Sequence, residues 1–249
     1  MINPGLNNKT VLITGANSGI GREISTIFAE MGSNIIFHYF EDDEMAEEMV
    51  NSLRNFSVDV LPFKGDLKNA SVINNLFDKA VSKFGSIDIL INNAAVAEFP
   101  DNTFETNEKS FYNHFDINVK AVLLLINRFV NLHKDQGKVD GHIVNISTDA
   151  SQKFANQISY GASKAAVEAY TRSIAIEVGK FGITVNCVAP GPVQTGYIDK
   201  ELEEYVLPTI PMNRLGVPKD IADAVVFFSS DQSKWITGQV ILVSGGHYI

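Results

Sequence analysis

The chain has 249 residues, which is long enough to bury an apolar core without disulfide bonds or metal. Its 20 basic and 29 acidic residues give a formal net charge of −9, which argues against a surface for nucleic acid or for an anionic membrane. The single cysteine, Cys187, excludes an internal disulfide framework, and no cluster of cysteine and histidine predicts a metal site.

The N-terminus and the longest apolar run predict neither a signal peptide nor a membrane span. The N-terminus MINPGLNNK is polar and lacks the pattern of a signal peptide. The longest apolar run, AVLLLI at 121–126, is far shorter than the ~20 residues needed to cross a bilayer. We therefore expect a cytoplasmic protein without a membrane partner.

Short runs rich in β-branched residues alternate with helical patterns along the whole chain. Nearly continuous apolarity in these runs is typical of strands covered on both faces. The sequence predicts an α/β fold with a doubly wound, parallel seven-stranded sheet in one domain spanning 1–249, because no linker or repeat divides it. The expected strands are 10–14, 34–39, 58–63, 87–92, 142–147, 183–189 and 239–243, and the expected helices are 19–31, 43–54, 69–83, 107–133, 159–179 and 218–229.

The turn after the first expected strand reads TGANSGIG, from Thr14 to Gly21. Its glycines at 15, 19 and 21 allow a tight turn and a close approach to a pyrophosphate at the start of the following helix. Glycine is also common in such turns for geometry alone. The position after the first strand, with a long helix behind it, favours dinucleotide binding.

Five motifs in order connect this turn with a known family. TGANSGIG is followed by NNAA at 92–95, NIS at 145–147, YGASK at 160–164 and VAPGPVQT at 188–195. Together they resemble the short-chain dehydrogenases/reductases, in the subclass of roughly this chain length, and among these the 3-oxoacyl-carrier-protein reductase-like members. The resemblance extends to WITGQVILVSGG near the end. Ala95 replaces a glycine, and Ser244 an aspartate, that are more usual in the family.

The resemblance implies a catalytic group on residues that the predicted sheet brings to one edge. A hydride that reaches a carbonyl carbon leaves negative charge on oxygen, which must receive a proton. Thirteen residues separate Ser147 from Tyr160, as in the family. Taken alone, Ser147 could equally be a strand-end cap and Asn118 a helix residue bonded to backbone. The resemblance implies that Tyr160 is the acid/base and that Ser147 hydrogen-bonds to the substrate oxygen. It also implies that Lys164 lowers the Tyr160 pKa and holds the nicotinamide ribose. Asn118 would hold a water molecule.

The same resemblance implies a cofactor site along the carboxyl ends of the strands. A site that prefers NAD usually carries a carboxylate about 20 residues beyond the glycine turn. The residue 20 positions after Gly19 is Tyr39, which has no carboxylate, so we predict that NADP(H) is preferred to NAD(H). The acidic residues Glu41 to Asp43 would oppose NADP(H) binding if they faced the site. The implied cofactor-binding residues are Gly15, Asn17, Ser18, Gly19, Ile20, Gly21, Tyr39, Phe40, Asp66, Leu67, Asn92, Ala94, Tyr160, Lys164, Pro190, Gly191, Val193 and Thr195.

The predicted function is NADP(H)-dependent reduction of a 3-oxoacyl thioester or another ketone to an alcohol. An NAD-dependent alcohol or sugar dehydrogenase and a non-catalytic cofactor-binding regulator are the alternatives. The stretch 192–215 mixes apolar and acidic residues and predicts a substrate lid. The helices expected at 107–133 and 159–179 carry more apolar surface than one sheet covers, and the resemblance implies that they pair between subunits in a homotetramer.

Overall fold

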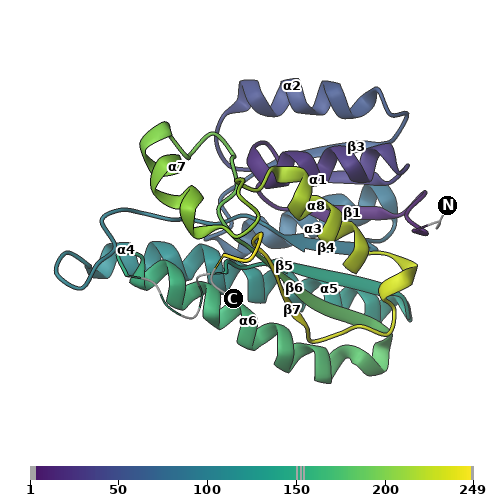
Figure 1. Ribbon diagram of the computed structural model, residues 1–249. Coiled ribbons are helices and arrows are strands. Elements are labelled where there is room, and N and C mark those ends of the chain that lie inside the picture. The colour runs from purple at the N-terminus through teal and green to yellow at the C-terminus, as the bar shows by residue number, and fades with distance from the viewer. Residues whose placement is uncertain (1–3, 150, 152, 154, 248–249) are drawn as a thin grey trace.

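A computed structural model describes residues 4–149, 151, 153 and 155–247. It contains one all-parallel sheet of seven strands in the order β3-β2-β1-β4-β5-β6-β7, which confirms the predicted fold class (Figure 1). The strands are β1 (Thr10–Ile13), β2 (Asn34–Tyr39), β3 (Val60–Lys64), β4 (Ile89–Asn92), β5 (Gly141–Ile146), β6 (Ile183–Pro190) and β7 (Val240–Val243). β2 has the expected bounds, and the ends of the other strands differ from the expected ones by at most two residues.

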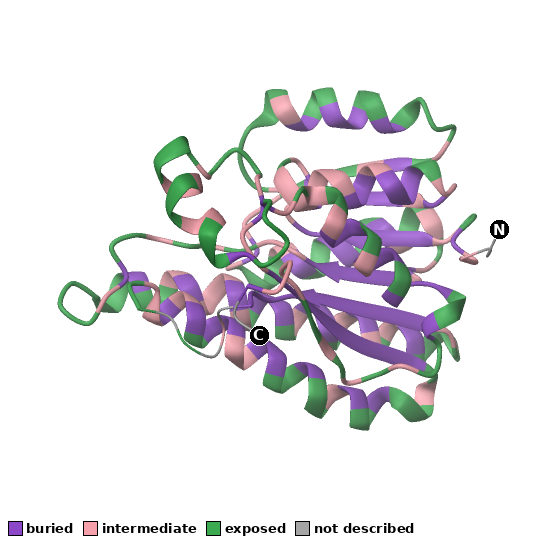
Figure 2. Cartoon of the chain, viewed as in Figure 1, coloured by how far each residue is buried: buried purple, intermediate pink, exposed green. Residues whose placement is uncertain are grey.

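Helices cover both faces of the sheet, so two apolar layers form. The helices are α1 (Gly19–Glu30), α2 (Asp43–Arg54), α3 (Ala70–Phe84), α4 (Glu108–Phe115), α5 (Val122–Gln136), α6 (Ile158–Val178), α7 (Lys200–Val206) and α8 (Pro218–Phe228). One layer joins α1, α2 and α8 to the sheet, and the other joins α3, α5 and α6. The strands β1, β2, β4, β5 and β6 are therefore the most buried part of the fold, while the outer faces of the helices are exposed (Figure 2).

The expected helix at 107–133 is interrupted. α4 ends at Phe115, a π-helical segment spans Asp116–Ala121, and α5 begins at Val122. Such segments insert an extra residue into a helix and frequently occur at functional sites. Here the segment contains Asn118, one of the predicted catalytic residues.

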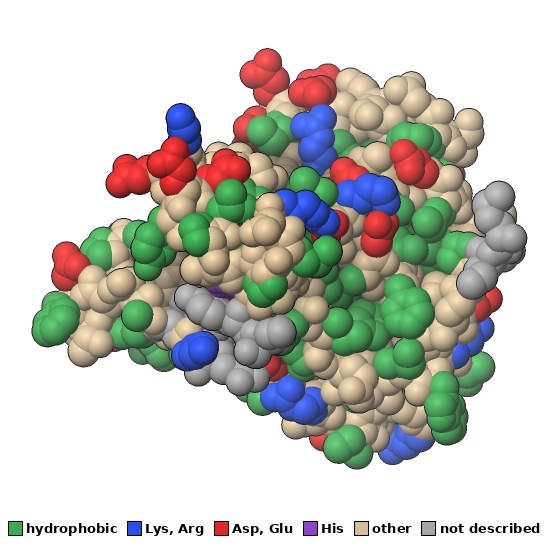
Figure 3. All heavy atoms as spheres, in the orientation of Figure 1, with side chains coloured by type: hydrophobic (Ala, Val, Ile, Leu, Met, Phe, Trp, Pro, Cys, Tyr) green, Lys and Arg blue, Asp and Glu red, His purple; other side chains and the backbone are tan. Residues whose placement is uncertain are grey.

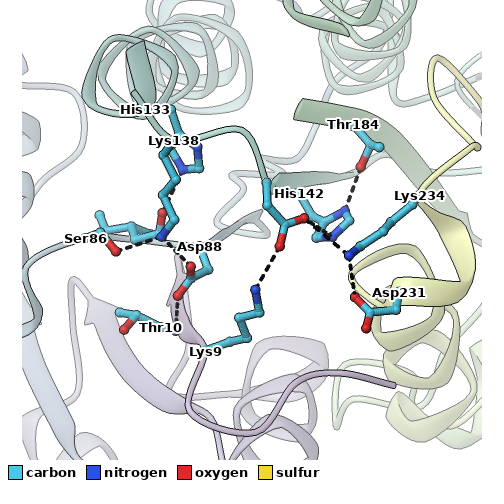
Figure 4. A network of polar contacts seen from close by, with 12 residues as sticks. Lys9, Thr10, Ser86, Asp88, His133, Lys138, His142, Thr184, Asp231 and Lys234 are labelled. Atoms are coloured by element: carbon cyan, nitrogen blue, oxygen red, sulfur yellow. Dashed lines mark hydrogen bonds and ion pairs between the residues drawn. The ribbon is translucent and has the colours of Figure 1, made fainter. Parts of the chain in front are cut away.

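A polar network ties the amino ends of the strands together (Figure 4). Asp88, which precedes β4, accepts a hydrogen bond of 2.7 Å from the backbone N–H of Thr10 and pairs with Lys138. Asp140, which precedes β5, pairs with Lys9 at 2.9 Å. These contacts fasten the sheet at the end opposite to the carboxyl ends of the strands.

The order of strands places a candidate site at the carboxyl edge. β1 pairs with β2 on one side and with β4 on the other, so the direction in which successive strands are added to the sheet reverses between β1 and β4. Ligands of doubly wound sheets bind in the crevice above this reversal. No helix in the described part of the chain is long and apolar enough to cross a membrane.

Candidate active site

Two adjoining cavities lie at the carboxyl edge and share Ala95. The larger, of about 510 Å³, is lined by Gly15, Asn17, Ser18, His38, Phe40, Glu41, Asp42, Met45, Gly65, Asp66, Leu67, Lys68, Ala94, Ala95, Val96 and Ile117. The smaller, of about 240 Å³, is lined by Ile20, Asn93, Ala95, Ile146, Ser147, Thr148, Tyr160, Lys164, Pro190, Gly191, Val193 and Thr195. Most of the predicted cofactor-binding residues therefore border one cavity or the other.

The glycine turn requires its glycines. Gly15 has φ +62°, and a Cβ there would lie 3.0 Å from the Cα of Ala94. A Cβ at Gly21 would lie 2.0 Å from the carbonyl oxygen of Gly15. Ser18, the N-cap of α1, makes no side-chain capping bond, so its hydroxyl does not satisfy the N–H groups of the first turn. This arrangement is suited to an anion at the helix start.

Asn93 holds the glycine turn, a role that the sequence analysis did not assign. Its Nδ2 donates to the carbonyl oxygens of Thr14 and Gly15, both at 2.9 Å, and its backbone N–H donates to Thr14 Oγ1 at 3.0 Å. The predicted neighbour Asn92 instead lies inside the sheet and donates to Asn145 Oδ1 at 2.8 Å. Asn92 lines neither cavity, whereas Asn93, Ala94 and Ala95, which follow it, line one or both.

His38 is a second residue at the larger cavity that sequence reasoning missed. The Gly15 N–H donates to its Nδ1 at 3.4 Å, while its Nε2 lies 2.9 Å from the carbonyl oxygen of Gly65. Burial is the main cause that lowers the His38 pKa to about 4, so the ring is neutral at pH 7. It joins the glycine turn to the loop that contains Asp66 and Leu67. The signal in the sequence was a histidine inside an apolar strand.

The end of β2 differs from the expectation for Tyr39. Its side chain packs against the apolar layer of α1 and α2 and hydrogen-bonds to Asp43, so Tyr39 does not line the cavity. Phe40 lines it as predicted, and the carboxylates of Glu41 and Asp42 border it as well. Among the described residues that line this cavity, Lys68 is the only cation, and its Nζ donates to Asn113 Oδ1 at 2.7 Å.

Tyr160 and Lys164 face the smaller cavity from the first turns of α6. Lys164 Nζ lies 5.8 Å from the centroid of the Tyr160 ring and donates to the carbonyl oxygen of Ile146 at 2.8 Å. Burial, followed by the charge of Asp149, raises the Tyr160 pKa to about 12. Burial lowers the Lys164 pKa to about 8.

Ser147 and Asn118 are both hydrogen-bonded within the protein. Ser147 Oγ donates to Glu168 Oε1 at 2.8 Å. Asn118 Nδ2 donates to the carbonyl oxygen of Val96 at 2.9 Å and to Ser163 Oγ at 3.0 Å, while its Oδ1 accepts from the Val96 N–H at 2.8 Å. The Asn118 side chain therefore holds the loop after β4 against α6.

A buried aspartate from that same loop caps α6. The Asp101 carboxylate accepts hydrogen bonds from the backbone N–H groups of Ser159 and Tyr160, at 2.8 and 2.9 Å. Burial alone would raise the Asp101 pKa, but these bonds lower it overall. Asp101 thus fixes the helix turn that presents Tyr160.

Comparison with known proteins gives full-length matches. The model of a family described as Enoyl-(Acyl carrier protein) reductase matches residues 15–248. The chain is 37% identical over 246 residues to a 3-oxoacyl-[acyl-carrier-protein] reductase of Staphylococcus aureus, covering 97% of this chain and 98% of the relative. It is 35% identical over 242 residues to an uncharacterized oxidoreductase of Bacillus subtilis, covering 96% of each.

Solved structures share the fold. A short-chain dehydrogenase/reductase variant of Serratia marcescens matches with a TM-score of 0.91 and 29% identity, over 98% of this chain and 99% of the other. A 7α-hydroxysteroid dehydrogenase in complex with NADH and 7-oxo glycochenodeoxycholic acid also matches with a TM-score of 0.91, at 33% identity, over 98% of this chain and 96% of the other.

Proposed function

The chain belongs to the short-chain dehydrogenase/reductase family, and from this premise we propose that it reduces a ketone to an alcohol with a reduced nicotinamide cofactor. The observation that carries the proposal is that Tyr160 and Lys164 face one cavity beside the Pro190–Gly191 turn. That cavity adjoins the larger cavity, which is lined by residues of the glycine turn, and the two share Ala95.

The residues present fit a dinucleotide. The glycine turn leaves no space for a Cβ at Gly21, and the start of α1 is suited to the pyrophosphate. The larger cavity would take the adenosine, and Pro190, Gly191, Val193 and Thr195 would cover the nicotinamide in the smaller one. When bound, the reduced cofactor supplies a hydride.

The chain's own residues supply the proton. As the carbonyl carbon gains a bond to hydrogen, the π electrons of the C=O bond move to oxygen, and that oxygen takes the phenolic proton of Tyr160. The raised Tyr160 pKa keeps the phenol protonated at pH 7, which is the state that reduction needs. Oxidation of an alcohol needs the phenolate instead.

The test is Tyr160→Phe, which removes the proton donor and keeps the ring. We expect kcat to fall by at least ~100-fold, as general acid catalysis typically contributes that much, while the dissociation constant of the cofactor changes little. The absorbance of the reduced cofactor measures kcat, and a fluorescence titration measures the dissociation constant of the cofactor. A variant that keeps wild-type turnover contradicts the assignment. Wild-type protein that binds cofactor and reduces no ketone supports the non-catalytic regulator.

For the cofactor, the larger cavity supports NAD(H), the opposite of the preference expected from Tyr39. Glu41 and Asp42 border the cavity at the end of β2, where the adenosine ribose lies in doubly wound dinucleotide sites. Their charges would repel a 2′-phosphate. Lys68, the cation among the described lining residues, already contacts Asn113. We therefore propose that NAD(H) is preferred.

The preference is tested by measuring kcat/KM for NADH and NADPH. Asp42→Ser removes a charge and leaves a hydroxyl able to cap α2, whose Met45 N–H now donates to Asp42 Oδ1. We expect Asp42→Ser and Glu41→Gln to raise the relative use of NADPH. Glu47→Gln, on the exposed side of α2, is the control. A wild-type preference for NADPH would restore the sequence-based prediction.

For the substrate, we propose an uncharged ketone. The lid helix α7 carries Glu201, Glu203 and Glu204 against one lysine, and acidic side chains gather over it in Figure 3. This charge disfavours the phosphates of a carrier-bound thioester. A matched pair tests it: 3-oxobutyryl-CoA and its uncharged N-acetylcysteamine thioester contain the same ketone. We expect the higher kcat/KM with the uncharged ester, and the reverse result would favour an anionic acyl thioester.

A further inference from the structure

We propose that His114, a buried histidine of α4, is a positioning residue that fixes the ring of Tyr160 for proton transfer. This inference rests on the proposed ketone reduction, in which Tyr160 donates the proton. Its basis is that one imidazole contacts the Tyr160 ring and also holds the loop after β4.

The hydrogen bonds of His114 determine which of its ring nitrogens carries a proton. Nε2 lies 3.0 Å from the backbone nitrogen of Glu98 and accepts that N–H. Because a neutral imidazole has one acceptor and one donor nitrogen, the proton is on Nδ1, which donates to the carbonyl oxygen of Ser110 at 2.8 Å. The two bonds therefore fix the ring between the loop after β4 and the preceding turn of α4.

The fixed imidazole packs against the proton donor. Its centroid lies 6.4 Å from that of the Tyr160 ring, and the two planes meet at 64°, which is an edge-to-face arrangement. His114 is 0% exposed, so protein encloses its ring on every side. Since a closely packed ring moves only when its neighbours move, the position of His114 limits the position of the Tyr160 ring.

The loop that His114 holds also contacts the start of α6. Asn113 Nδ2 donates to Glu98 Oε1 at 2.7 Å, so α4 holds Glu98 by its side chain as well as by its backbone. Three residues after Glu98, the Asp101 carboxylate accepts the backbone N–H of Tyr160 at 2.9 Å. Tyr160 is thus held at its backbone by Asp101 and at its ring by His114, and we expect loss of the His114–Glu98 bond to loosen both contacts.

His114 lines neither cavity, so replacing it removes no contact to a ligand in either one. The phenol must still lie within hydrogen-bond reach of the substrate oxygen, and a misplacement of about 1 Å can lower a rate by ~100-fold. A change at His114 should therefore lower kcat and leave the dissociation constant of the cofactor nearly unchanged. This difference separates a loss of position from a general loss of structure.

The experiment compares three variants with the wild-type protein on the best ketone of a panel. His114→Phe keeps a ring and removes the acceptor for the Glu98 N–H, whereas His114→Gln supplies a side-chain oxygen as acceptor. Ser110→Ala is the matched control, because it removes a buried hydroxyl 3.4 Å from Nδ1 and keeps the carbonyl oxygen to which His114 donates.

We expect His114→Phe to lower kcat by at least ~10-fold, with the dissociation constant of the cofactor within about three-fold of the wild-type value. His114→Gln should recover most of the lost kcat, and Ser110→Ala should keep the wild-type kcat. Thermal unfolding of each variant sets a temperature at which all of them are folded, and His114→Leu replaces His114→Phe if the latter does not fold.

Three results overturn the inference while the proposed function stands. They are a wild-type kcat in His114→Phe, equal losses in His114→Gln and His114→Phe, and a loss in Ser110→Ala as large as that in His114→Phe. The second would show that the acceptor does not matter, and the third would assign the effect to local packing. A wild-type protein that reduces no ketone contradicts the proposed function, and the inference fails with it.

Discussion

Burial acts on Tyr160 and Lys164 in the same sense, because it favours the neutral form of each group. It raises the pKa of the phenol to about 12 and lowers that of the ammonium to about 8. At pH 7 the tyrosine therefore keeps its proton and most of the lysine is charged. The titrations of the two groups should therefore affect the pH dependence of kcat/KM differently.

We predict that kcat/KM for reduction is level near pH 7 and declines above about pH 8, as Lys164 loses its charge. Lys164→Arg, whose side chain stays charged, should be less active because its geometry differs, but it should lack the decline. Initial rates from pH 6 to 10 at saturating cofactor measure this. An identical decline in Lys164→Arg would assign it to another group.

His38 predicts a pH dependence of stability. Its pKa falls from 6.5 in the unfolded chain to about 4 in the fold, so the unfolded state binds the proton first as pH drops. The contribution of neutral His38 to the free energy of unfolding is therefore complete above pH 6.5. As the pH falls from 6.5 to about 4, the protein loses about 3 kcal/mol of this contribution. Urea unfolding at pH 7 and pH 4.5 measures it. His38→Asn should show a smaller loss between these pH values, and an equal loss would exclude His38 as the source.

Tyr39 shows what distance along the chain does not give. It was chosen by its distance from the glycine turn, yet its neighbours His38 and Phe40 line the larger cavity. Distance along the chain locates the end of a strand. Which of two neighbours faces the cavity depends on strand alternation and on the layer each faces, which requires the packed helices.

At the scale of elements, the start of α6 depends on a residue far from it in the sequence. Asp101 lies in the loop after β4 and accepts the N–H groups of Ser159 and Tyr160. We predict that Asp101→Ala lowers the free energy of unfolding by about 1–2 kcal/mol, the usual value of a lost helix cap, and lowers kcat because Tyr160 lies in the freed turn.

Asp116→Ala is the matched control, since it removes an exposed pair with Lys120 that should be worth less than about 1 kcal/mol. Chemical denaturation and steady-state rates compare the two variants. Equal stability changes, or an unaltered kcat in Asp101→Ala, would show that the cap does not position Tyr160.

The elements themselves follow from the sequence to different degrees. The strands were predictable because apolar β-branched runs bounded by turns are typical of buried parallel strands. The π-helical segment at Asp116–Ala121 was not, because one extra residue in an otherwise regular pattern does not disturb amphipathicity enough to be seen. The stretch 192–215, predicted to be a lid, contains the helix α7, which follows from the Asp199 cap that accepts from the Leu202 N–H.

At the scale of the whole molecule, many of the exposed apolar side chains in the described part of the chain lie on two surfaces. One lies on α4 and α6 and includes Phe111, Tyr112, Tyr170 and Ile176, the last 85% exposed. The other lies on the side of α8 and β7, where hydrophobic side chains gather in Figure 3, and includes Phe227, Trp235, Ile241 and Leu242. Two separate surfaces of this kind suit a closed assembly with two types of two-fold interface.

We therefore predict a homotetramer, with a mass about four times 27.3 kDa by light scattering. Ile176→Asp and Leu242→Asp should each halve that mass by placing a charge in one interface. Phe56→Asp, in the loop after α2, should leave it unchanged. A wild-type mass near 27.3 kDa with full activity contradicts the prediction.

The order of strands has a consequence for how the chain is made. β1 to β4 occupy one contiguous half of the sheet, in the order β3-β2-β1-β4, and every residue that lines the larger cavity lies at or before Ile117. Tyr160, Lys164 and the Pro190–Gly191 turn come later. Because a chain is synthesised from its N-terminus, the nascent protein contains every described residue that lines the larger cavity, the proposed adenosine site, before Tyr160 and Lys164 have been added.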